Sequence, residues 1–468
     1  MLLRQTPRIG GVSFESETAM MATLHRSGDD FLFCVKGAPE AVLRHSRWVA
    51  EPFGETDLDP AGREKWLERT RELAEDGLRV LAVASKLEPS KEAPAYDGLV
   101  FLGLIGLSDP PREDVPAAIR SCTEAGVRVV MITGDHAVTA RKIAAAIGLP
   151  GTDAGVIEGS ELKPEAELSE TEKQSILATN VFARVSPAQK LELVSLHQGR
   201  GEIVAMTGDG VNDAPALKQA DIGVAMGLRG TQVAKEAAAM VLTDDAFATI
   251  VHAIREGRVI FRNIQRFVAY LISCNLSEIL IVGLAVLAGL PLPLLPLQIL
   301  FLNLITDVFP AFALGVCAGD DGILGRPPRD PIKPILTRSI WILIVFTALA
   351  ITGATLGGFY IARTSLSLEG NGALTVSFLI LAFAQLWNVF NMRDPSAPIF
   401  RNDIVRNPYI WAAIAGCTGL LLLAVYTPIL AQTLHLVHLD PNAWALVIGL
   451  SVMPVVVVQI GKLFMVRW

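Results

Sequence analysis

Six long apolar segments fill the second half of the chain, and they limit the possible folds more than any other feature of the sequence. They lie at about residues 262–290, 295–316, 340–362, 374–392, 409–431 and 443–465. A helix of about 20 residues crosses a hydrocarbon layer of roughly 30 Å. Inside a bilayer every backbone polar group needs a partner within the protein, which a helix provides. We therefore predict that residues 246–468 form an all-α bundle of six transmembrane helices.

Basic residues are unevenly distributed over the connectors between these segments. The connectors on one side contain only Arg363, whereas those on the other side contain Arg255, Arg258, Arg262, Arg266, Arg326, Arg329, Lys333, Arg338, Arg393, Arg401, Arg406, Lys462 and Arg467. Cytoplasmic connectors are the ones enriched in Lys and Arg. We expect an integral, multi-pass protein of the cell membrane, surrounded by lipid, with both termini in the cytoplasm.

The charge of the chain argues against a nucleic-acid partner. From Glu256 to Trp468 there are 13 basic and 10 acidic residues, a net charge of +3, which leaves −10 for the first 255 residues within the total of −7. Neither part is basic enough to attract nucleic acid. The cysteines show no paired or zinc-ligand spacing, so we expect ordinary thiols at Cys34, Cys122, Cys274, Cys317 and Cys417.

Two neighbouring membrane segments each contain a carboxylate with helper oxygens. Asn275 and Glu278 are three residues apart, and Asn303, Thr306 and Asp307 stand at i, i+3 and i+4, so each set shares a helix face. Ionisable side chains are costly within a membrane. Hard cations such as Ca²⁺ bind carboxylate, amide and hydroxyl oxygens. We interpret these residues as a cation site; the alternative is a polar pair that joins two helices by hydrogen bonds.

Two further features accompany this pattern. Pro310 follows Asp307 and would loosen the helix, which could free backbone carbonyls as additional ligands. On the fourth segment, Gln385, Asn388 and Asn391 form a polar stripe that fits helix packing as well as it fits coordination.

Between residues 98 and 226, apolar runs of strand length alternate with helical stretches. The runs are LVFLGLIGLSDPP, VRVVMITGD, NVFARVSP, EIVAMTGDG and ADIGVAMG. This alternation is typical of a parallel sheet built from βαβ units. Ligands bind outside the carboxyl ends of such strands, so we expect the chemistry in the loops that follow them.

The loop TGDGVNDAPAL is the most informative of these. Gly208 and Gly210 allow a sharp turn, while Asp209, Asn212 and Asp213 gather two carboxylates and an amide at one strand end. Such a set can hold Mg²⁺, which prefers one or two carboxylates with water and phosphate oxygens. The alternative is an acidic turn that caps the next helix.

Two other loops fit a phosphate site. Thr133, Gly134 and Asp135 end a strand and offer a hydroxyl and backbone N–H groups at a helix start, where anions are favoured. Lys190 can offer an ammonium to a transferring phosphoryl group, and Arg184 is a weaker candidate of the same kind.

The first 97 residues are less regular. FLFCVKGAPE reads as a strand that runs into a turn at Lys36, and GLRVLAVAS reads as a strand with Arg79 at its start. These segments predict a mixed α+β lobe.

With these residues in view, the chain resembles the P-type ATPases, and within them the class that contains calcium pumps. The motifs KGAPE, DPPR, MITGD, TGDGVNDAPAL and the paired membrane motifs occur in the order of that family. The resemblance implies a partial nucleotide-binding domain at 1–88, an incomplete haloacid-dehalogenase-like phosphorylation domain at 95–245, and a membrane domain at 246–468. It identifies the six helices with the last six of the family's ten.

The resemblance also implies roles at matching positions, with ATP and Mg²⁺ as cofactors and Ca²⁺ as the transported cation. Phe14 would stack on adenine, with Lys36 and Arg79 near the nucleotide, and Asp109 and Arg112 would couple the nucleotide to the phosphorylation site. Thr133, Gly134, Asp135, Arg184 and Lys190 would face the phosphoryl group, Asp209 would hold Mg²⁺ supported by Asn212 and Asp213, and Asn275, Glu278, Asn303, Thr306, Asp307 and Gln385 would bind the cation.

The sequence departs from the family pattern in several places. It contains no DKTGT run, which bears the phosphorylated aspartate, and no TGE loop of the family's A domain. Ala19 stands where the family usually has a lysine, and Gln385 where some calcium pumps have glutamate. The missing strand is expected at the centre of the parallel sheet, so we expect unpaired strand edges, a tendency to aggregate, and no phosphoenzyme from the chain alone.

Three interpretations follow from these features. The first is part of a Ca²⁺ pump that works within a longer product or with a separately encoded N-terminal half; Mn²⁺, another hard cation or H⁺ counter-transport stay open under it. The second is a non-catalytic membrane protein that binds cations or regulates a full-length pump. The third, a phosphatase fused to a membrane anchor, leaves Glu278 and Asp307 unexplained.

Overall fold

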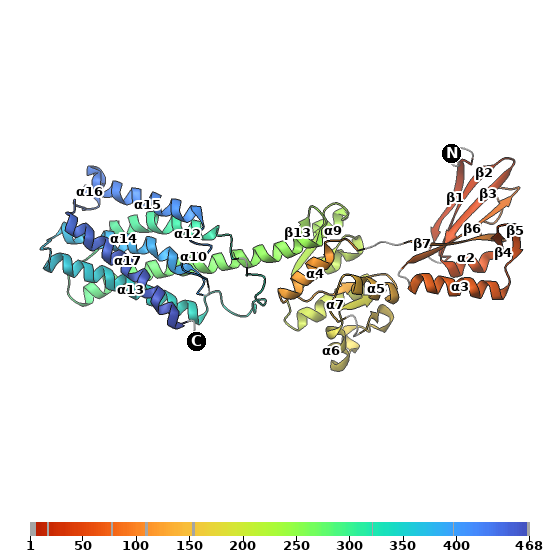
Figure 1. Cartoon of the computed structure of the whole chain (residues 1–468), viewed down its shortest axis with the longest axis horizontal. Helices are drawn as coiled ribbons and strands as arrows, with labels where there is room; N and C mark the ends of the chain where they lie inside the picture. Colours follow the sequence, from red (N-terminus) through yellow and green to blue (C-terminus); the bar gives the residue numbers. More distant parts are fainter. Residues whose placement is uncertain are drawn as a thin grey trace. The chain divides into compact units, whose positions relative to one another are not determined.

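The computed structural model describes residues 6–15, 18–75, 78–107, 111–151, 155–320, 322–395 and 397–465. The chain divides into two compact units, each described here by itself. The first comprises residues 1–123 and 127–250, and the second comprises residues 124–126 and 251–468. Figure 1 shows their helices and strands and labels most of them.

The first unit begins with a seven-stranded mixed sheet in the order β1-β2-β3-β6-β7-β4-β5. Its strands are β1 (Arg8–Glu15), β2 (Met20–Ser27), β3 (Asp30–Gly37), β4 (Ser46–Glu51), β5 (Gly54–Asp57), β6 (Arg79–Glu88) and β7 (Leu99–Leu107). Two helices, α2 (Pro39–His45) and α3 (Pro60–Glu75), pack on it (Figure 1). Val42 and Leu43 of α2 meet Phe101 of β7 in a buried apolar cluster, which fixes this face as the core of the lobe.

One predicted strand lies in a different sheet from the one expected. The run LVFLGLIGL was expected to open the parallel sheet, but it forms β7, which pairs antiparallel with β6 and parallel with β4. An apolar run of this length fits either sheet, and its partners decide between them.

The remaining strands of the first unit form two separate three-stranded parallel sheets. One has the order β8-β10-β9 and the other β11-β12-β13. Their strands are β8 (Met131–Ile132), β9 (Ile157–Glu158), β10 (Val181–Ala183), β11 (Ala205–Gly208), β12 (Ile222–Met226) and β13 (Met240–Leu242). The helices around them are α4 (Val115–Glu124), α5 (Ala137–Ala146), α6 (Glu170–Ala178), α7 (Pro187–Gly199), α8 (Ala214–Gln219) and α9 (Gln232–Ala237). Within the described residues β8 and β11 each pair on one side only, in agreement with an incomplete parallel sheet.

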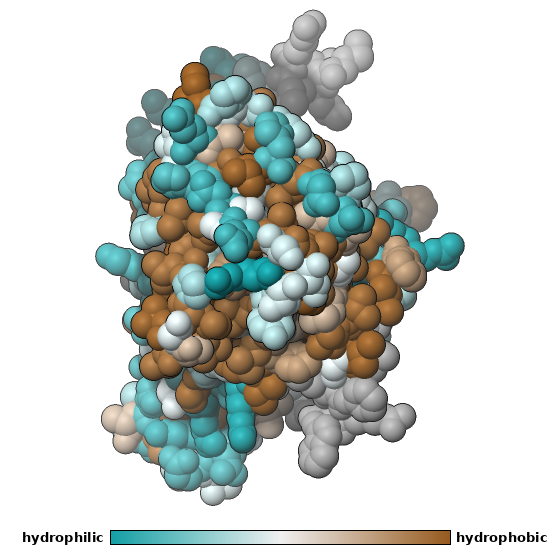
Figure 2. All heavy atoms as spheres, turned by 90° about the vertical axis from the view of Figure 1, so that its left-hand side faces the viewer, coloured by the Kyte–Doolittle hydropathy of each residue, from teal (hydrophilic) through white to brown (hydrophobic). Residues whose placement is uncertain are grey.

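The second unit is a helical bundle with six helices long and apolar enough to cross a membrane in the described part of the chain. They are α10 (Phe247–Leu287), the segment α11 (Pro296–Leu302) with α12 (Val308–Gly315), α13 (Arg338–Thr364), α14 (Asn371–Asn388) with a 3₁₀ turn at Val389–Met392, α15 (Pro408–Tyr426) and α17 (Pro441–Met465). In Figure 2, which looks at the molecule from the left-hand side of Figure 1, hydrophobic side chains in brown cover much of the visible face. The six predicted spans are thus present.

Two helix ends differ from the predicted ones. The first helix begins at Phe247, well before the expected residue 262, because the charges between Arg255 and Arg262 are unfavourable in hydrocarbon but are compatible with a helix. The fifth ends at Tyr426 and is followed by the short helix α16 (Pro428–Thr433), because Pro428 cannot continue the hydrogen-bond ladder.

The helix α14 lies at the centre of the bundle and positions the candidate site. Nearly all of its side chains are buried. It approaches α13 closely at Gly358, where an added Cβ would lie 2.2 Å from Cδ1 of Ile380. Its polar side chains therefore find their partners within the bundle, on neighbouring helices or on α14 itself.

Candidate functional site

Polar side chains from three separate helical segments meet in the core of the bundle. The Gln385 amide nitrogen on α14 donates a hydrogen bond of 2.9 Å to Oε1 of Glu278 on α10. The Thr306 hydroxyl, between α11 and α12, lies 3.0 Å from the Gln385 amide oxygen and 2.8 Å from the carbonyl of Leu302. The fold thus joins three of the predicted cation ligands in one hydrogen-bonded group.

Asp307 adds a second carboxylate to this group. Its Oδ2 accepts a hydrogen bond of 3.3 Å from the Asn275 amide. Its Oδ1 is buried and has no hydrogen-bond partner within the described residues. Asp307 and Glu278 are only 3% and 4% exposed. A buried carboxylate oxygen without a partner is costly, so this atom marks a place where a cation would be stabilised.

Asn303 lies between the two carboxylates. Its side-chain oxygen faces acceptors only, and the same position lies 3.3 Å from Asp307 Oδ2 and 3.3 Å from Glu278 Oε1. With the amide turned, its nitrogen would donate to both. With the oxygen inward, three oxygens converge at separations that suit ligands of one cation at about 2.3–2.6 Å. Both orientations place Asn303 at the centre of the site.

The segment that carries these residues is not a regular α-helix. Asn303–Asp307 form a single π-helical turn between α11 and α12. Pro310 has no N–H for the carbonyl of Thr306, and the Tyr270 hydroxyl on α10 donates to that carbonyl at 2.9 Å instead. The predicted loosening at Pro310 is therefore present, although Tyr270 takes the carbonyl that it frees.

Tyr270 was not among the residues predicted from the sequence. Its spacing could have indicated a role, because Tyr270, Cys274 and Glu278 follow one another at intervals of four residues and so share one helix face. A single aromatic residue in an apolar segment is too common for this spacing to stand out.

Removing the Tyr270 hydroxyl is expected to weaken the bundle. Tyr270→Phe leaves the Thr306 carbonyl buried without a donor, so it should lower the free energy of unfolding by about 1–3 kcal/mol. Thermal unfolding of the purified chain in detergent measures this loss. The matched control is Tyr426→Phe, because Tyr426 is 52% exposed. Equal midpoints for the two variants would contradict the assigned role.

The polar stripe on the fourth segment divides into two parts. Gln385 binds Glu278, whereas Asn388 donates to the Ser273 hydroxyl at 2.9 Å and Asn391 donates to Asn388 at 3.1 Å. The last two contacts are between neutral groups. The Asn391 oxygen also accepts a hydrogen bond of 3.1 Å from Gln459 on α17. Asn388 and Asn391 therefore join helices, and Gln385 belongs with the carboxylates.

The oxygen set fits a hard cation. It comprises two carboxylates, the amide oxygens of Asn275, Asn303 and Gln385, and the Thr306 hydroxyl. In the described part of the chain no three His, Cys, Asp or Glu side chains gather in a metal-like group, so carboxylates alone do not form the site. Ca²⁺ accepts such mixed oxygen ligands in flexible numbers.

In the first unit, the predicted acidic loop is built around Asp213. Its Oδ1 accepts a hydrogen bond of 2.7 Å from the Lys190 ammonium on α7, and its Oδ2 accepts one of 3.2 Å from the Gly210 N–H. Asp213 is 7% exposed. Both of its oxygens are thus occupied, and the exposed Asp209 and Asn212 are left to face a ligand.

Gly208 is required for this arrangement. An added Cβ would lie 2.6 Å from the Asp213 Cβ, closer than side chains tolerate. Gly208→Ala should displace Asp213 from Lys190 and destabilise the domain by about 1–3 kcal/mol, the usual cost of overpacking. The control is Gly199→Ala, because nothing lies within 4 Å of the Cβ there. Chemical denaturation of both variants is the measurement, and equal stabilities would show that the loop adapts.

A second group of predicted residues forms at the end of β8. The Thr133 hydroxyl lies 3.1 Å from Asp135 Oδ2 and accepts a hydrogen bond of 3.1 Å from the Asp135 N–H. Arg184 follows β10 with a φ of +50°, and its guanidinium lies 2.8 Å from the His136 ring. Its backbone N–H donates to the Asp135 carbonyl at 3.1 Å. The structure therefore brings Thr133, Asp135 and Arg184 together.

These two groups are separate in this structure. Among the described residues, no hydrogen bond or ion pair joins the loop at Thr133–Asp135 to Lys190, Asp209 or Asp213. The first group lies on the β8 sheet and the second on the β11 sheet. The two groups of residues are therefore separate because the two sheets that carry them are not paired with each other within the described residues.

Arg112 contacts the far end of the same domain. Its guanidinium donates to the Asp245 carbonyl at 2.5 Å. The Asp245 carboxylate accepts hydrogen bonds of 2.9 Å from the N–H groups of Leu228 and Arg229, which lower its pKa below the ordinary value. Asp109, predicted beside Arg112, lies outside the described residues.

The residues predicted to bind nucleotide share one end of the first sheet. Lys36 pairs with Val83 on β6, and Arg79 begins that strand, so alternation places both on the face opposite the buried Ala82. Phe14, near the end of β1, is 59% exposed. An exposed aromatic ring and two cations at the same end of a sheet are compatible with a nucleotide site.

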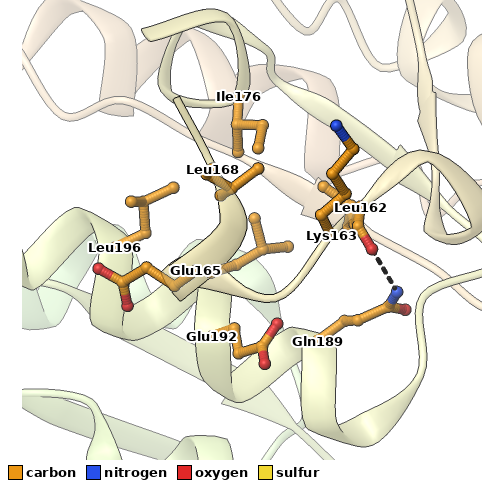
Figure 3. Close-up of a pocket in the computed structure, with 9 residues that line it drawn as sticks. Leu162, Lys163, Glu165, Leu168, Ile176, Gln189, Glu192 and Leu196 are labelled. Atoms are coloured by element: carbon orange, nitrogen blue, oxygen red, sulfur yellow. Dashed lines mark hydrogen bonds between the residues drawn. The ribbon is translucent and has the colours of Figure 1, made fainter. Parts of the chain in front are cut away.

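Figure 3 shows a small pocket elsewhere in the first unit. It has a volume of about 20 Å³, and Leu162, Leu168, Ile176 and Leu196 form its apolar walls. The Gln189 amide donates to the Leu162 carbonyl at 3.4 Å across its edge. It has room for about one water molecule and contains none of the predicted site residues.

Comparisons with known proteins agree with these features. The family model for the C-terminus of cation-transporting ATPases matches residues 291–464, the model for the cytoplasmic domain N of P-type ATPases matches residues 2–114, and a haloacid dehalogenase-like hydrolase model matches residues 188–254. The match at 2–114 includes β7, in agreement with the pairing of β7 and β6 in the first sheet.

Among curated proteins, the chain is similar to calcium-transporting ATPases. It is 41% identical over 448 residues to one of Bacillus subtilis (strain 168), covering 94% of this chain and 50% of that protein. It is 40% identical to calcium-transporting ATPase 1 of Yarrowia lipolytica, covering 94% and 49%, and 38% identical to the probable cation-transporting ATPase F of Mycobacterium tuberculosis, covering 98% and 51%. The chain thus spans about half the length of these relatives.

A haloacid dehalogenase-like α/β part, followed by six helices long and apolar enough to cross a membrane in the described part of the chain, defines a class of membrane proteins with a hydrolase-like domain. Within that class, this chain belongs to the P-type cation-transporting ATPases and resembles its calcium pumps.

Proposed function

We propose that this chain provides the cation site, the Mg²⁺ loop and part of the nucleotide lobe of an ATP-driven Ca²⁺ pump. The observation that carries this proposal is the convergence of Glu278 and Asp307 around Asn303, with Asp307 Oδ1 buried and without a hydrogen-bond partner among the described residues. Helix packing alone would not require two buried carboxylates, because amides could join the helices without charge.

Ca²⁺ is the preferred cation for two reasons. The six side chains of the site carry carboxylate, amide and hydroxyl oxygens and no thiolate or imidazole, which favours hard cations over copper or zinc. They come from flexible amide, hydroxyl and carboxylate groups, and Ca²⁺ tolerates irregular geometry better than Mg²⁺ does. The relatives named as calcium-transporting ATPases support the same choice.

In the cytoplasmic domain, the residues divide the work of phosphoryl transfer. Asp213 holds the Lys190 ammonium at 2.7 Å, so that the cation is positioned at the loop. Asp209 and Asn212 are exposed and would hold Mg²⁺, which supplies charge neutralisation on phosphate oxygens when bound. The hydroxyl of Thr133, with Gly134 and Asp135, would contact the phosphoryl group at a helix start.

In the first lobe, Phe14 would stack on the base of ATP, and Lys36 and Arg79 would face its phosphates. The acceptor aspartate of a DKTGT run is not in this sequence. We propose that it comes from polypeptide outside this sequence, equivalent to the other half of the relatives, and that the first unit lies in the cytoplasm of the cell that carries the pump.

The proposal is tested by supplying the other half. The 468-residue chain is co-expressed with the N-terminal half of the Bacillus subtilis relative, and ATP-driven uptake of radioactive Ca²⁺ is measured in membrane vesicles. We expect uptake that disappears with Asp209→Asn, which removes the exposed carboxylate of the loop. Uptake of Mn²⁺ without Ca²⁺ would reassign the cation, and equal uptake with Asp209→Asn would contradict the proposed Mg²⁺ loop.

A further inference from the structure

A cavity of about 400 Å³ lies at the end of the helical bundle where α10, α13 and α17 carry basic residues. It is separate from the cation site. The apolar part of its lining, here called the apolar wall, comprises Ala269, Ile340, Leu343 and Met392. The charged part, here called the charged wall, comprises Arg262, Arg266, Arg393, Asp394 and Lys462. A cavity with one apolar and one cationic wall suits an amphiphile.

The cations of the charged wall are unusually buried. Arg266, Arg393 and Lys462 are 6%, 5% and 3% exposed. Basic side chains at a membrane end are usually solvated or paired, because removing a charge from water is expensive. Each of these three buried positive charges therefore requires a partner that compensates it.

Two of the four cations have carboxylate partners. Arg266 forms a bidentate pair with Asp403, one bond of which is 3.0 Å. Arg262 pairs with Asp320 at 2.6 Å and with Asp394. Asp320 and Asp394 are also shared with Arg326.

Within the described part of the chain, the other two cations donate to uncharged oxygens. Arg393 donates to Gln459 Oε1 at 2.9 Å and to backbone carbonyls. Lys462 donates to the carbonyls of Arg393, at 3.0 Å, and Asn391. Among the described residues of this cluster, five cations (Arg262, Arg266, Arg326, Arg393 and Lys462) face three carboxylates (Asp320, Asp394 and Asp403). Counted over the described residues, this cluster thus has a surplus of two positive charges.

The apolar wall indicates what brings the compensating anion. Ile340 and Leu343 stand on the first turns of α13, beside Trp341 and Ile342, which are 45% and 48% exposed. Exposed tryptophan at the end of a membrane helix is typical of the headgroup level of a bilayer. An inorganic phosphate would fill little of the cavity and would leave this wall bare.

We propose that this cavity binds an anionic phospholipid, with the headgroup phosphate against Arg393 and Lys462 and an acyl chain along Ile340 and Leu343. Basic pockets between membrane helices bind anionic headgroups by this combination of charge and apolar contact. The site would make the stability of the bundle depend on the lipid composition of its membrane.

The test measures lipid retention by the purified 468-residue chain, and it does not depend on pump activity. The chain is equilibrated in detergent with equal amounts of phosphatidylglycerol and phosphatidylcholine, and native mass spectrometry counts the bound lipids. We expect one phosphatidylglycerol to be retained at least about tenfold over phosphatidylcholine, as a charge-assisted contact implies. Equal retention of the two lipids would overturn the proposal.

Two variants place the lipid in this cavity while leaving the buried cations in place. Gln265→Glu adds a carboxylate on the lining, and Ser339→Trp fills space on the α13 side. Each should reduce the preference for phosphatidylglycerol by about tenfold or more. Gln432→Glu, on an exposed position of α16 outside the cavity, is the matched control and should leave it unchanged.

A further arm distinguishes the lipid from a free anion. Inorganic phosphate at 10 mM (about a hundredfold over the lipid) should not displace phosphatidylglycerol, because it lacks the apolar contact. Displacement by phosphate, or retention unchanged in both Gln265→Glu and Ser339→Trp, would show that the cavity binds a free anion or nothing, and would overturn the proposal.

Discussion

Asp307→Asn is expected to lower the affinity of the chain for Ca²⁺ by roughly a hundredfold or more. The substitution keeps the shape of the side chain but removes a charge that is 3% exposed and has an oxygen without a partner. Losing one member of a buried charge pair costs about 2–5 kcal/mol, which corresponds to this range of affinity. Equilibrium binding of radioactive Ca²⁺ to the purified chain in detergent measures it.

Glu278→Gln should also lower the affinity for Ca²⁺, but by a smaller factor than Asp307→Asn. Glu278 already accepts a hydrogen bond from Gln385, so part of its charge is compensated without the cation. The matched control is Asp440→Asn, where the retained oxygen can still accept from the Ala443 N–H at the start of α17. If Asp307→Asn and Glu278→Gln both bind Ca²⁺ as the unchanged chain does, the assigned site is wrong.

The second large effect concerns phosphorylation. The chain alone should give no acid-stable label with radioactive ATP, because its sequence has no DKTGT run and its parallel strands form two sheets with β8 and β11 at their edges. Adding a polypeptide that carries this run should restore a Ca²⁺-dependent label. In that combined protein Lys190→Ala should reduce the label by about 10²–10³-fold, the usual loss when an electrostatic contact to a transferring group is removed.

The control for this experiment is Glu192→Gln. Glu192 lies on the same helix as Lys190 but beside the small pocket of Figure 3. It should label normally. A Ca²⁺-dependent label on the isolated chain would show that an acceptor other than the DKTGT aspartate is at work.

The sequence was most informative where the period of a helix decides which side chains share a face. The spacing of Asn303, Thr306 and Asp307 predicted one shared face. In the structure Asn303 lies beside Asp307 and Glu278, and Thr306 lies beside Gln385, which binds Glu278. Spacing within a helix fixes direction, because consecutive turns repeat. The six spans were predictable for a similar reason, since hydrocarbon thickness sets helix length.

The sequence was less informative where contacts depend on several elements at once. Gln385, Asn388 and Asn391 look alike in sequence, and only the positions of α10 and α17 separate a carboxylate partner from neutral ones. The strand β7 was assigned to the wrong sheet for the same reason, since an apolar run does not specify its neighbours. The buried cluster at Arg266 and Lys462 was read only as a sign of orientation.

The π turn at Asn303–Asp307 makes the length of this segment as important as its residues. A π turn contains more residues than an α turn of the same rise, so α11 and α12 are offset in register by this surplus. Deleting one residue there would turn everything that follows by about 100° around the helix axis. Relatives are therefore expected to vary in the side chains of this segment more freely than in its number of residues.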